Sequence, residues 1–309
     1  MKLNISIGGL FSMNSALILG GTQFFGKKLV HILLDKGVKV TIATRGTTPD
    51  SFGDQVERLI INREDRASLE KAFTTKHWDV VYDQTCYSSE EARDAMEVLD
   101  GKVGRYVFTS SQAVYDFGHL RSESEFNPLA FQPELKKRNE YSGITGYQEA
   151  KRAAEAILFQ NSNVPVVAVR FPIVVGKDDY TNRLKFHVDK IVQGEPIGIP
   201  NPSLRFSFIE SSEAAAFLYE MGRSTFEGPI NPGSQGDISL KELIDVIEVR
   251  SNKVANVSRD INISPYSMEG SFSVNTNLAS SLGFKFKPLD ELIGGLINYY
   301  IQTQAETIK

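Results

Sequence analysis

Cysteine and histidine are scarce in this sequence of 309 residues. It holds a single cysteine, Cys86, and four histidines. One cysteine excludes a disulfide within the chain and a cysteine-rich zinc site, and the scattered histidines lack the spacing of metal ligands. We therefore expect no metal site, and a protein of the reducing cytoplasm.

Long apolar runs and an excess of basic residues are also missing. No run reaches the roughly 18 to 20 apolar residues that cross a bilayer, so no membrane partner is expected. The 34 basic and 38 acidic residues leave a net charge of −4. That balance makes a nucleic-acid partner unlikely, because such partners select for basic surfaces. The content of 41% hydrophobic and 23% charged residues is that of a globular protein.

Short apolar runs alternate with amphipathic segments through the first half of the chain, which is typical of βαβ units. Six strands are predicted, with helices between them: 16–19, 38–44, 58–61, 79–83, 106–110 and 166–170. This pattern predicts an α/β fold with a doubly wound parallel Rossmann sheet over residues 13–170. Residues 1–12 are interpreted as an N-terminal extension, with Met13 as the native start.

Beyond residue 170, glycine and proline become frequent and the expected elements are shorter. Ser239 and Glu242 form a predicted capping box, and a final amphipathic helix is expected from about Leu289. We find neither an internal repeat nor a low-complexity linker. Residues 171–309 are therefore predicted to form mainly a smaller α/β substrate-binding cap, which can interleave with the Rossmann core.

A glycine-rich loop joins the first predicted strand to its helix, at residues 20–26 (GGTQFFG). Such a loop lets backbone N–H groups and the helix N-terminus hold a pyrophosphate, provided that glycine leaves the approach open. Gly20 and Gly26 keep the outer glycines of a G-x-x-G-x-x-G spacing, whereas Gln23 replaces the middle one. A tight strand–helix turn without a ligand would look similar.

Two further motifs carry chemistry. Tyr147 and Lys151 stand at i and i+4 of a predicted helix, so their side chains share one face. A lysine so placed is expected to lower the pKa of the tyrosine and make it a usable acid and base. Ser111 ends the fifth strand, at the edge where doubly wound sheets bind ligands. An ordinary surface pair and a plain turn are the alternatives.

The order of these motifs resembles the extended short-chain dehydrogenase/reductase superfamily, and within it the NAD-dependent epimerase/dehydratase family. The resemblance covers about residues 13–300. Three other segments are similar to that family: residues 109–115 (TSSQAVY), Arg170 with Gly176, and residues 205–209 (RFSFI) with Glu213.

The resemblance implies an NAD(P)-dependent oxidoreductase or epimerase, acting on a hydroxyl or keto group of a sugar nucleotide or similar small molecule. In its mechanism Ser111 orients the substrate oxygen, Tyr147 exchanges the proton and Lys151 holds the ribose, while hydride moves to or from nicotinamide. Gln112 follows Ser111 where dehydratases of the family carry an acidic pair. Epimerisation and ketone reduction are therefore favoured over dehydration.

The resemblance also implies which residues bind the ligands. The predicted cofactor contacts are Gly20, Thr22, Gln23, Phe24, Phe25, Gly26, Arg45, Asn62, Arg63, Gln84, Thr85, Cys86, Tyr147, Lys151 and Pro172. The predicted substrate contacts are Ser111, Arg183 and Arg205.

Arg45 bears on the choice of cofactor. The acidic residue that binds a free ribose 2′-OH is missing after the second strand, and Arg45 stands there instead. An arginine suits a 2′-phosphate, so NADP is favoured over NAD; a solvated loop arginine is the alternative. Cys86 is interpreted as a small buried filler rather than a redox centre.

Gln23 keeps a different function open. It makes the loop similar to the G-G-T-x-F-x-G variant of an atypical branch that includes chloroplast stem-loop-binding proteins, some with eroded catalytic residues. A dinucleotide-binding regulator or RNA-associated protein is therefore the alternative. The intact Ser111, Tyr147 and Lys151 and the pI of about 5.7 favour an enzyme. The family also suggests a homodimer formed through the helices at about 89–99 and 146–160.

Overall fold

The computed structural model describes residues 11–74 and 76–307. Most of the predicted N-terminal extension, residues 1–10, lies outside the described residues. The backbone N–H of Phe11 donates to the carbonyl oxygen of Arg223 at 3.1 Å. Met13 packs against the core of the central sheet.

The first half of the chain alternates strands and helices close to the predicted positions. These elements are β1 (Ser15–Leu19), α1 (Phe24–Asp35), β2 (Lys39–Thr44), β3 (Val56–Ile60), α2 (Arg66–Ala72), β4 (Val80–Asp83), α3 (Ser89–Leu99), β5 (Tyr106–Ser111), β6 (Gly118–Arg121), α4 (Gly143–Asn161) and β7 (Val166–Phe171).

The second half has shorter elements. They are β8 (Ile173–Val175), α5 (Arg183–Gln193), β9 (Pro196–Gly198), β10 (Arg205–Phe206), β11 (Phe208–Glu210), α6 (Ser211–Arg223), β12 (Gly228–Ile230), β13 (Ile238–Ser239), α7 (Leu240–Ser251), β14 (Asn256–Ser258), β15 (Phe272–Val274), α8 (Asn277–Ser281) and α9 (Leu289–Thr307). Ser239 caps α7 as predicted, with the reciprocal bonds to Glu242 at 3.1 and 2.7 Å.

The central sheet has seven parallel strands in the order β12-β7-β5-β4-β1-β2-β3. The doubly wound parallel fold is therefore confirmed. The sequence predicted six of these strands and missed β12, because three residues that include a glycine and a proline carry no strand pattern.

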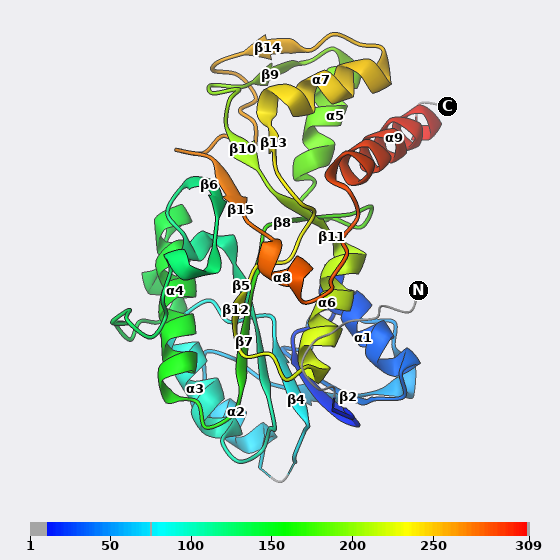
Figure 1. Cartoon of the computed structure of the whole chain (residues 1–309). Helices are drawn as coiled ribbons and strands as arrows, with labels where there is room; N and C mark the ends of the chain where they lie inside the picture. The colour runs from blue at the N-terminus through cyan, green and yellow to red at the C-terminus, as the bar shows by residue number, and fades with distance from the viewer. Residues whose placement is uncertain (1–10, 75, 308–309) are drawn as a thin grey trace.

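Helices cover both faces of this sheet (Figure 1). Ala16 and Ile18 of β1 pack on the side of α1 and α6, whereas Leu17 and Leu19 pack on the side of α2, α3 and α4. The alternation follows from the period of two in a strand. A strand buried on both faces needs an apolar residue at every position, which explains the unbroken apolar run of β1.

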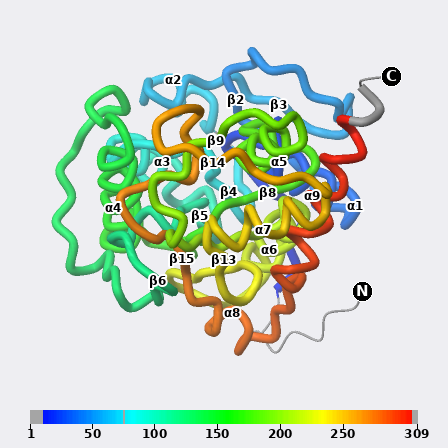
Figure 2. Tube along the Cα trace, turned by 90° about the horizontal axis from the view of Figure 1, so that it is seen from above, coloured from blue at the N-terminus to red at the C-terminus, as the bar shows by residue number. Residues whose placement is uncertain are grey.

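A smaller α/β layer forms the cap, with α5, α7 and α9 at one end of the central sheet (Figure 1). Seen from above, these helices project over the strands of the sheet (Figure 2). The largest sheet of the cap has the strand order β13-β10-β15-β6. Because β6 comes from the first half and β12 from the second, the two parts exchange strands.

Residues 127–141, here called the strap, lead along the chain to the start of α4. The Gln160 amide donates to the carbonyl oxygens of Pro128 and Phe131 at 2.8 and 2.7 Å. The backbone N–H of Lys136 donates to the Ser89 hydroxyl at 2.7 Å. The strap therefore contacts both α3 and α4.

Among the described residues, no helix is both long and apolar enough to cross a membrane.

Candidate active site

A cavity of about 310 Å³ lies where β5 and β7 end, between the central sheet and the cap. Parallel strands direct ligands to this edge. The residues that line it are Phe24, Phe25, Gln84, Tyr87, Thr109, Ser110, Ser111, Gln112, Ile144, Tyr147, Lys151, Phe171, Pro172, Ile173, Val174, Tyr180, Thr181, Arg183, Met268 and Phe272. The structure thus brings Ser111, Tyr147, Lys151 and Arg183 to one cavity.

The Ser111 hydroxyl and the Tyr147 phenol face the same cavity. Burial raises the pKa of Tyr147 above its ordinary value, although the Ser111 hydroxyl and the positive charge of Arg183 act in the opposite direction. The i, i+4 spacing predicted a pKa lowered by Lys151, and that prediction is wrong for this structure. The phenol is therefore protonated at neutral pH, ready to donate a proton.

The reason lies in how Lys151 is held. Its ammonium donates to the carbonyl oxygens of Cys86 at 3.0 Å and Thr109 at 2.9 Å. It is 2% exposed and lies 5.8 Å from the ring centroid of Tyr147. The ammonium is thus hydrogen-bonded to these main-chain oxygens and not to the Tyr147 hydroxyl.

The glycine loop is shaped by close neighbours. Gly20 has a φ of +112°, and a Cβ there would lie 2.9 Å from the methyl group of Thr85. A Cβ on Gly26 would collide with the amide of Gln84. Gln23 precedes α1 without forming a side-chain cap, so the first N–H groups of the helix remain available to an anion.

A second cavity, of about 240 Å³, adjoins the loop and the ends of β2 and β3. Among the predicted cofactor contacts it is lined by Gly20, Thr22, Gln23, Arg45, Asn62, Arg63 and Thr85. Arg45 is exposed, and within the described part of the chain no ion pair or hydrogen bond holds its side chain. Its guanidinium is therefore available to a ligand in this cavity.

The Arg63 guanidinium is paired with other groups of the protein. It binds Asp83 through two bonds of 2.5 and 2.7 Å and donates to the carbonyl oxygen of Glu91. Burial opposes ionisation of Asp83, yet the Arg63 guanidinium holds the pKa of this carboxyl below its usual value. The prediction of an adenine contact is not supported for the charged group of Arg63, because it is already paired.

Cys86 and Arg205 also differ from the predicted contacts. The Cys86 side chain lines neither cavity, and burial raises the pKa of its thiol to about 12. Arg205 pairs with Asp237 at 2.6 Å and with Glu242 at 3.1 Å, beside a separate cavity between α7 and α9. The structure does not bring Arg205 to Tyr147, so its predicted contact with the substrate is not supported.

Several cavity residues were not predicted. Met268 and Phe272 close the cavity from the cap, and Tyr180 and Thr181 come from the loop before α5. They share no local pattern, because only the folded chain brings them together. Tyr87 lines both cavities. Its one sequence clue is its position directly after the predicted contacts Gln84 to Cys86.

Three buried polar atoms beside the larger cavity have no hydrogen-bond partner among the described residues. They are Gln84 Nε2, Thr109 Oγ1 and Gln112 Oε1. An unpaired buried polar atom costs free energy. A polar ligand in the cavity could pair with these atoms. Together with the open glycine loop, they fit a dinucleotide.

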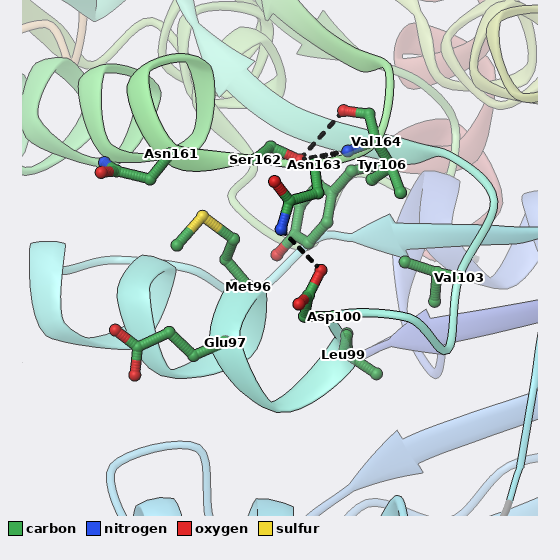
Figure 3. Close-up of a pocket in the computed structure, with 10 residues that line it drawn as sticks. All are labelled: Met96, Glu97, Leu99, Asp100, Val103, Tyr106, Asn161, Ser162, Asn163 and Val164. Carbon is green, nitrogen blue, oxygen red and sulfur yellow. Dashed lines mark hydrogen bonds between the residues drawn. The ribbon is translucent and has the colours of Figure 1, made fainter.

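A third cavity, of about 190 Å³, lies elsewhere, between the ends of α3 and α4 (Figure 3). Asn163 donates to Asp100 across it at 3.0 Å. It borders Tyr106, the first residue of β5, whereas Ser111 is the last. It therefore lies at the edge of the sheet opposite the ligand-binding edge.

Comparison with known proteins relates the chain to curated and solved relatives. The chloroplast stem-loop binding protein of 41 kDa b of Arabidopsis thaliana is 26% identical over 226 residues, which cover 68% of this chain and 56% of that protein. The chain thus spans little more than half the length of this relative.

Solved structures share the fold at low identity. The Bordetella bronchiseptica enzyme WbmG, in complex with NAD and UDP, is 16% identical with a TM-score of 0.72, covering 94% of each chain. The Thermus thermophilus UDP-glucose 4-epimerase, in complex with NAD, is 17% identical with a TM-score of 0.67, covering 93% of this chain and 98% of its own.

The family assignment rests on the sequence profile rather than on these structures. The profile of the NAD dependent epimerase/dehydratase family matches residues 16–225. This range contains the glycine loop, Ser111, Tyr147 and Lys151 and extends to the end of α6. The chain belongs to the NAD dependent epimerase/dehydratase family.

Proposed function

We propose that this protein is an NAD(P)-dependent epimerase or reductase that acts on a hydroxyl or keto group of a nucleotide sugar. The observation that supports this most is that the hydroxyls of Ser111 and Tyr147 line one cavity together with Lys151. A hydroxyl pair of this kind can bind one substrate oxygen and exchange its proton. The cytoplasm is its proposed location.

Each side chain has a distinct role. Tyr147 donates a proton to the substrate oxygen or removes one from it, and Ser111 holds that oxygen by a hydrogen bond. Lys151, fixed by two carbonyl groups, holds its charge beside the tyrosine ring and toward the ribose. Bound nicotinamide supplies the hydride chemistry, which no side chain can provide.

The cofactor would extend over both cavities. Gly20 and Gly26 leave room for a pyrophosphate, and the unpaired Gln84 amide borders the larger cavity. Arg45 favours NADP, because its guanidinium can bind a 2′-phosphate with two hydrogen bonds. The titles of the solved relatives name NAD, so the preference for NADP rests on Arg45.

The substrate would occupy the cap side of the larger cavity. Arg183, the first residue of α5, supplies a positive charge there, and its Nε donates to the Thr181 hydroxyl at 3.1 Å. A guanidinium at this place suits the diphosphate of a nucleotide sugar. The names of the solved relatives include UDP and UDP-glucose, which agrees with this class of substrate.

Tyr147→Phe tests the proposal. It removes one oxygen and keeps the ring, so the fold and NADP affinity should survive. Loss of general acid/base catalysis should lower turnover of a nucleotide sugar by roughly 10²- to 10⁴-fold. Tyr180→Phe is the matched control, because Tyr180 lines the same cavity but is 67% exposed. Steady-state kinetics should show near-normal turnover for the control; normal turnover by Tyr147→Phe would contradict the proposal.

A binding protein without turnover is the second candidate, favoured by the similarity to the Arabidopsis stem-loop binding protein. That candidate predicts dinucleotide binding by the wild type with no turnover across a panel of nucleotide sugars. It also predicts that the protein binds a stem-loop RNA at physiological salt. The acidic net charge of the chain opposes such binding. A gel-shift assay with such an RNA distinguishes this second candidate from the proposed enzyme.

A further inference from the structure

Tyr87 occupies an unusual place between the two cavities of the candidate site. It follows β4, and it is the one described residue that lines both the cavity at the glycine loop and the cavity of Tyr147. Its side chain is 40% exposed, in contrast to the buried Cys86 beside it. A ligand that fills both cavities must pass this ring.

The ring is held by cations that come from two directions. The Lys151 ammonium lies 4.9 Å from its centroid, and the Arg138 guanidinium lies 5.0 Å from it. The ring of Tyr147 is 6.4 Å away, tilted by 38°. Cations over an aromatic face are attracted by its quadrupole. Tyr87 therefore connects the catalytic helix α4 with the strap.

Arg138 is itself fixed. Its guanidinium binds the Glu91 carboxylate with bonds of 2.6 and 2.9 Å and donates to the carbonyl oxygen of Thr85 at 2.9 Å. The same carboxylate accepts from the backbone N–H of Tyr87 at 2.9 Å. One carboxylate thus orients both the backbone of Tyr87 and the cation above its ring.

We propose that Tyr87 contacts the central part of the bound dinucleotide, between the pyrophosphate and the nicotinamide, and that Arg138 is a positioning residue that holds its ring there. This inference rests on the cofactor of the proposed function. In the cavity that both line, the glycine loop offers backbone donors and the Tyr87 ring, which is 40% exposed, offers an apolar surface. Apolar ring contacts with a ribose or a nicotinamide need no hydrogen bond, so their strength depends on ring position.

The test measures affinity by titration calorimetry for NADP and for 2′,5′-ADP, a probe of the adenosine half alone. Tyr87→Ala should weaken NADP binding about ten-fold, the loss expected for one ordered aromatic contact. Binding of 2′,5′-ADP should change by less than about three-fold. Tyr87→Phe keeps the ring and should stay within about two-fold of the wild type for both ligands. Leu129→Ala, an exposed substitution on the strap, is the control.

Arg138→Met tests the positioning role. If Arg138 acts through the ring, Tyr87→Ala and the double variant should bind NADP equally weakly, and Arg138→Lys should recover part of the loss. Additive losses would overturn the role of Arg138.

Three results of these titrations would overturn the proposed role of Tyr87. Unchanged NADP affinity in Tyr87→Ala would overturn it. Equal losses for NADP and 2′,5′-ADP, with a lowered melting temperature, would also overturn it, since they mark a structural role. A wild type that binds neither NADP nor NAD would overturn the proposed cofactor and this inference together. If the wild type binds the cofactor and Tyr87→Ala binds it equally well, only the role of Tyr87 is overturned.

Discussion

The ammonium of Lys151 is bonded to two main-chain carbonyl oxygens, and its distance from the Tyr147 ring centroid is 5.8 Å. An i, i+4 spacing places the two side chains on one helix face, but it does not say which acceptors the lysine finds. Here Cys86, at the loop after β4, supplies one of them. The raised pKa of Tyr147 reflects the burial of its phenol.

Arg45 carries a prediction at the same scale. Arg45→Ala should weaken NADP binding by about 1.5 to 3 kcal/mol, the worth of a charge-assisted bond, and leave NAD binding nearly unchanged. Arg58→Ala is the control, because Arg58 is half-exposed and already paired with Asp50 at 2.7 Å. Calorimetry with both cofactors measures the difference. Equal losses for the two cofactors, or a wild-type preference for NAD, would refute the role of Arg45.

At the scale of elements, α5 links the substrate cavity to the core of the cap. It begins with Arg183 at the cavity and buries His187 one turn later. His187 Nδ1 donates to the Arg183 carbonyl oxygen at 2.8 Å, so Nε2 accepts from the Ser264 hydroxyl, also at 2.8 Å. The ring stacks on Tyr266 at 5.0 Å. Burial of the ring favours the neutral imidazole over the charged form.

Acid should therefore destabilise the cap. Burial lowers the pKa of His187 to about 4, while an unfolded histidine titrates near 6.5. Between these values the unfolded state binds more protons, so the free energy of unfolding should fall by up to about 3 kcal/mol as the pH drops from about 6.5 to about 4. Urea denaturation of wild type and His187→Gln measures the slope with pH.

The comparison isolates His187 from the carboxylates, which titrate in both proteins. His187→Gln should be less stable at neutral pH, because it loses ring packing, but its stability should fall less between about pH 6.5 and 4. His77→Gln is the control, since His77 is exposed. Identical slopes in wild type and His187→Gln would rule out this origin of the acid sensitivity.

At the scale of the whole molecule, core and cap are joined by buried polar contacts as well as by exchanged strands. Arg170 on β7 and Glu155 on α4 form an ion pair of 2.6 Å with both side chains fully buried. Arg170 donates to the Tyr115 hydroxyl at 2.9 Å, and that hydroxyl donates to Asn231. The Asn231 amide in turn donates to the carbonyl oxygens of Arg121, in β6 of the cap sheet, and Asn275, directly after β15. The site thus lies between two parts that share one polar network.

The strap bears on the oligomeric state. The homodimer expected from the sequence would pack through α3 and α4, which the strap contacts at Ser89 and Gln160. We therefore expect a species of 34.3 kDa in light scattering at micromolar concentration. Replacing residues 129–135 by a short glycine linker should expose the faces and favour dimers. A stable wild-type dimer would show that the strap leaves the faces free.

The sequence by itself determined six of the seven strands of the central sheet and the motifs that carry Ser111, Tyr147 and Lys151. The apolar runs of β1, β2, β4, β5 and β7 each allow only a strand buried on both faces, and their order requires a parallel sheet. Gly20, Ser111 and Tyr147 were predictable because each follows a local pattern next to a strand or within a helix.

Only the tertiary structure decided which side chains face one another. Arg63 and Arg205 each found a carboxylate partner far along the chain, Asp83 and Asp237, so their charges are used within the protein. Tyr87 lines both cavities, and the strap brings the Arg138 guanidinium to 5.0 Å from its ring centroid. No local pattern predicts such contacts, since their energy depends on groups that approach only after the chain has folded.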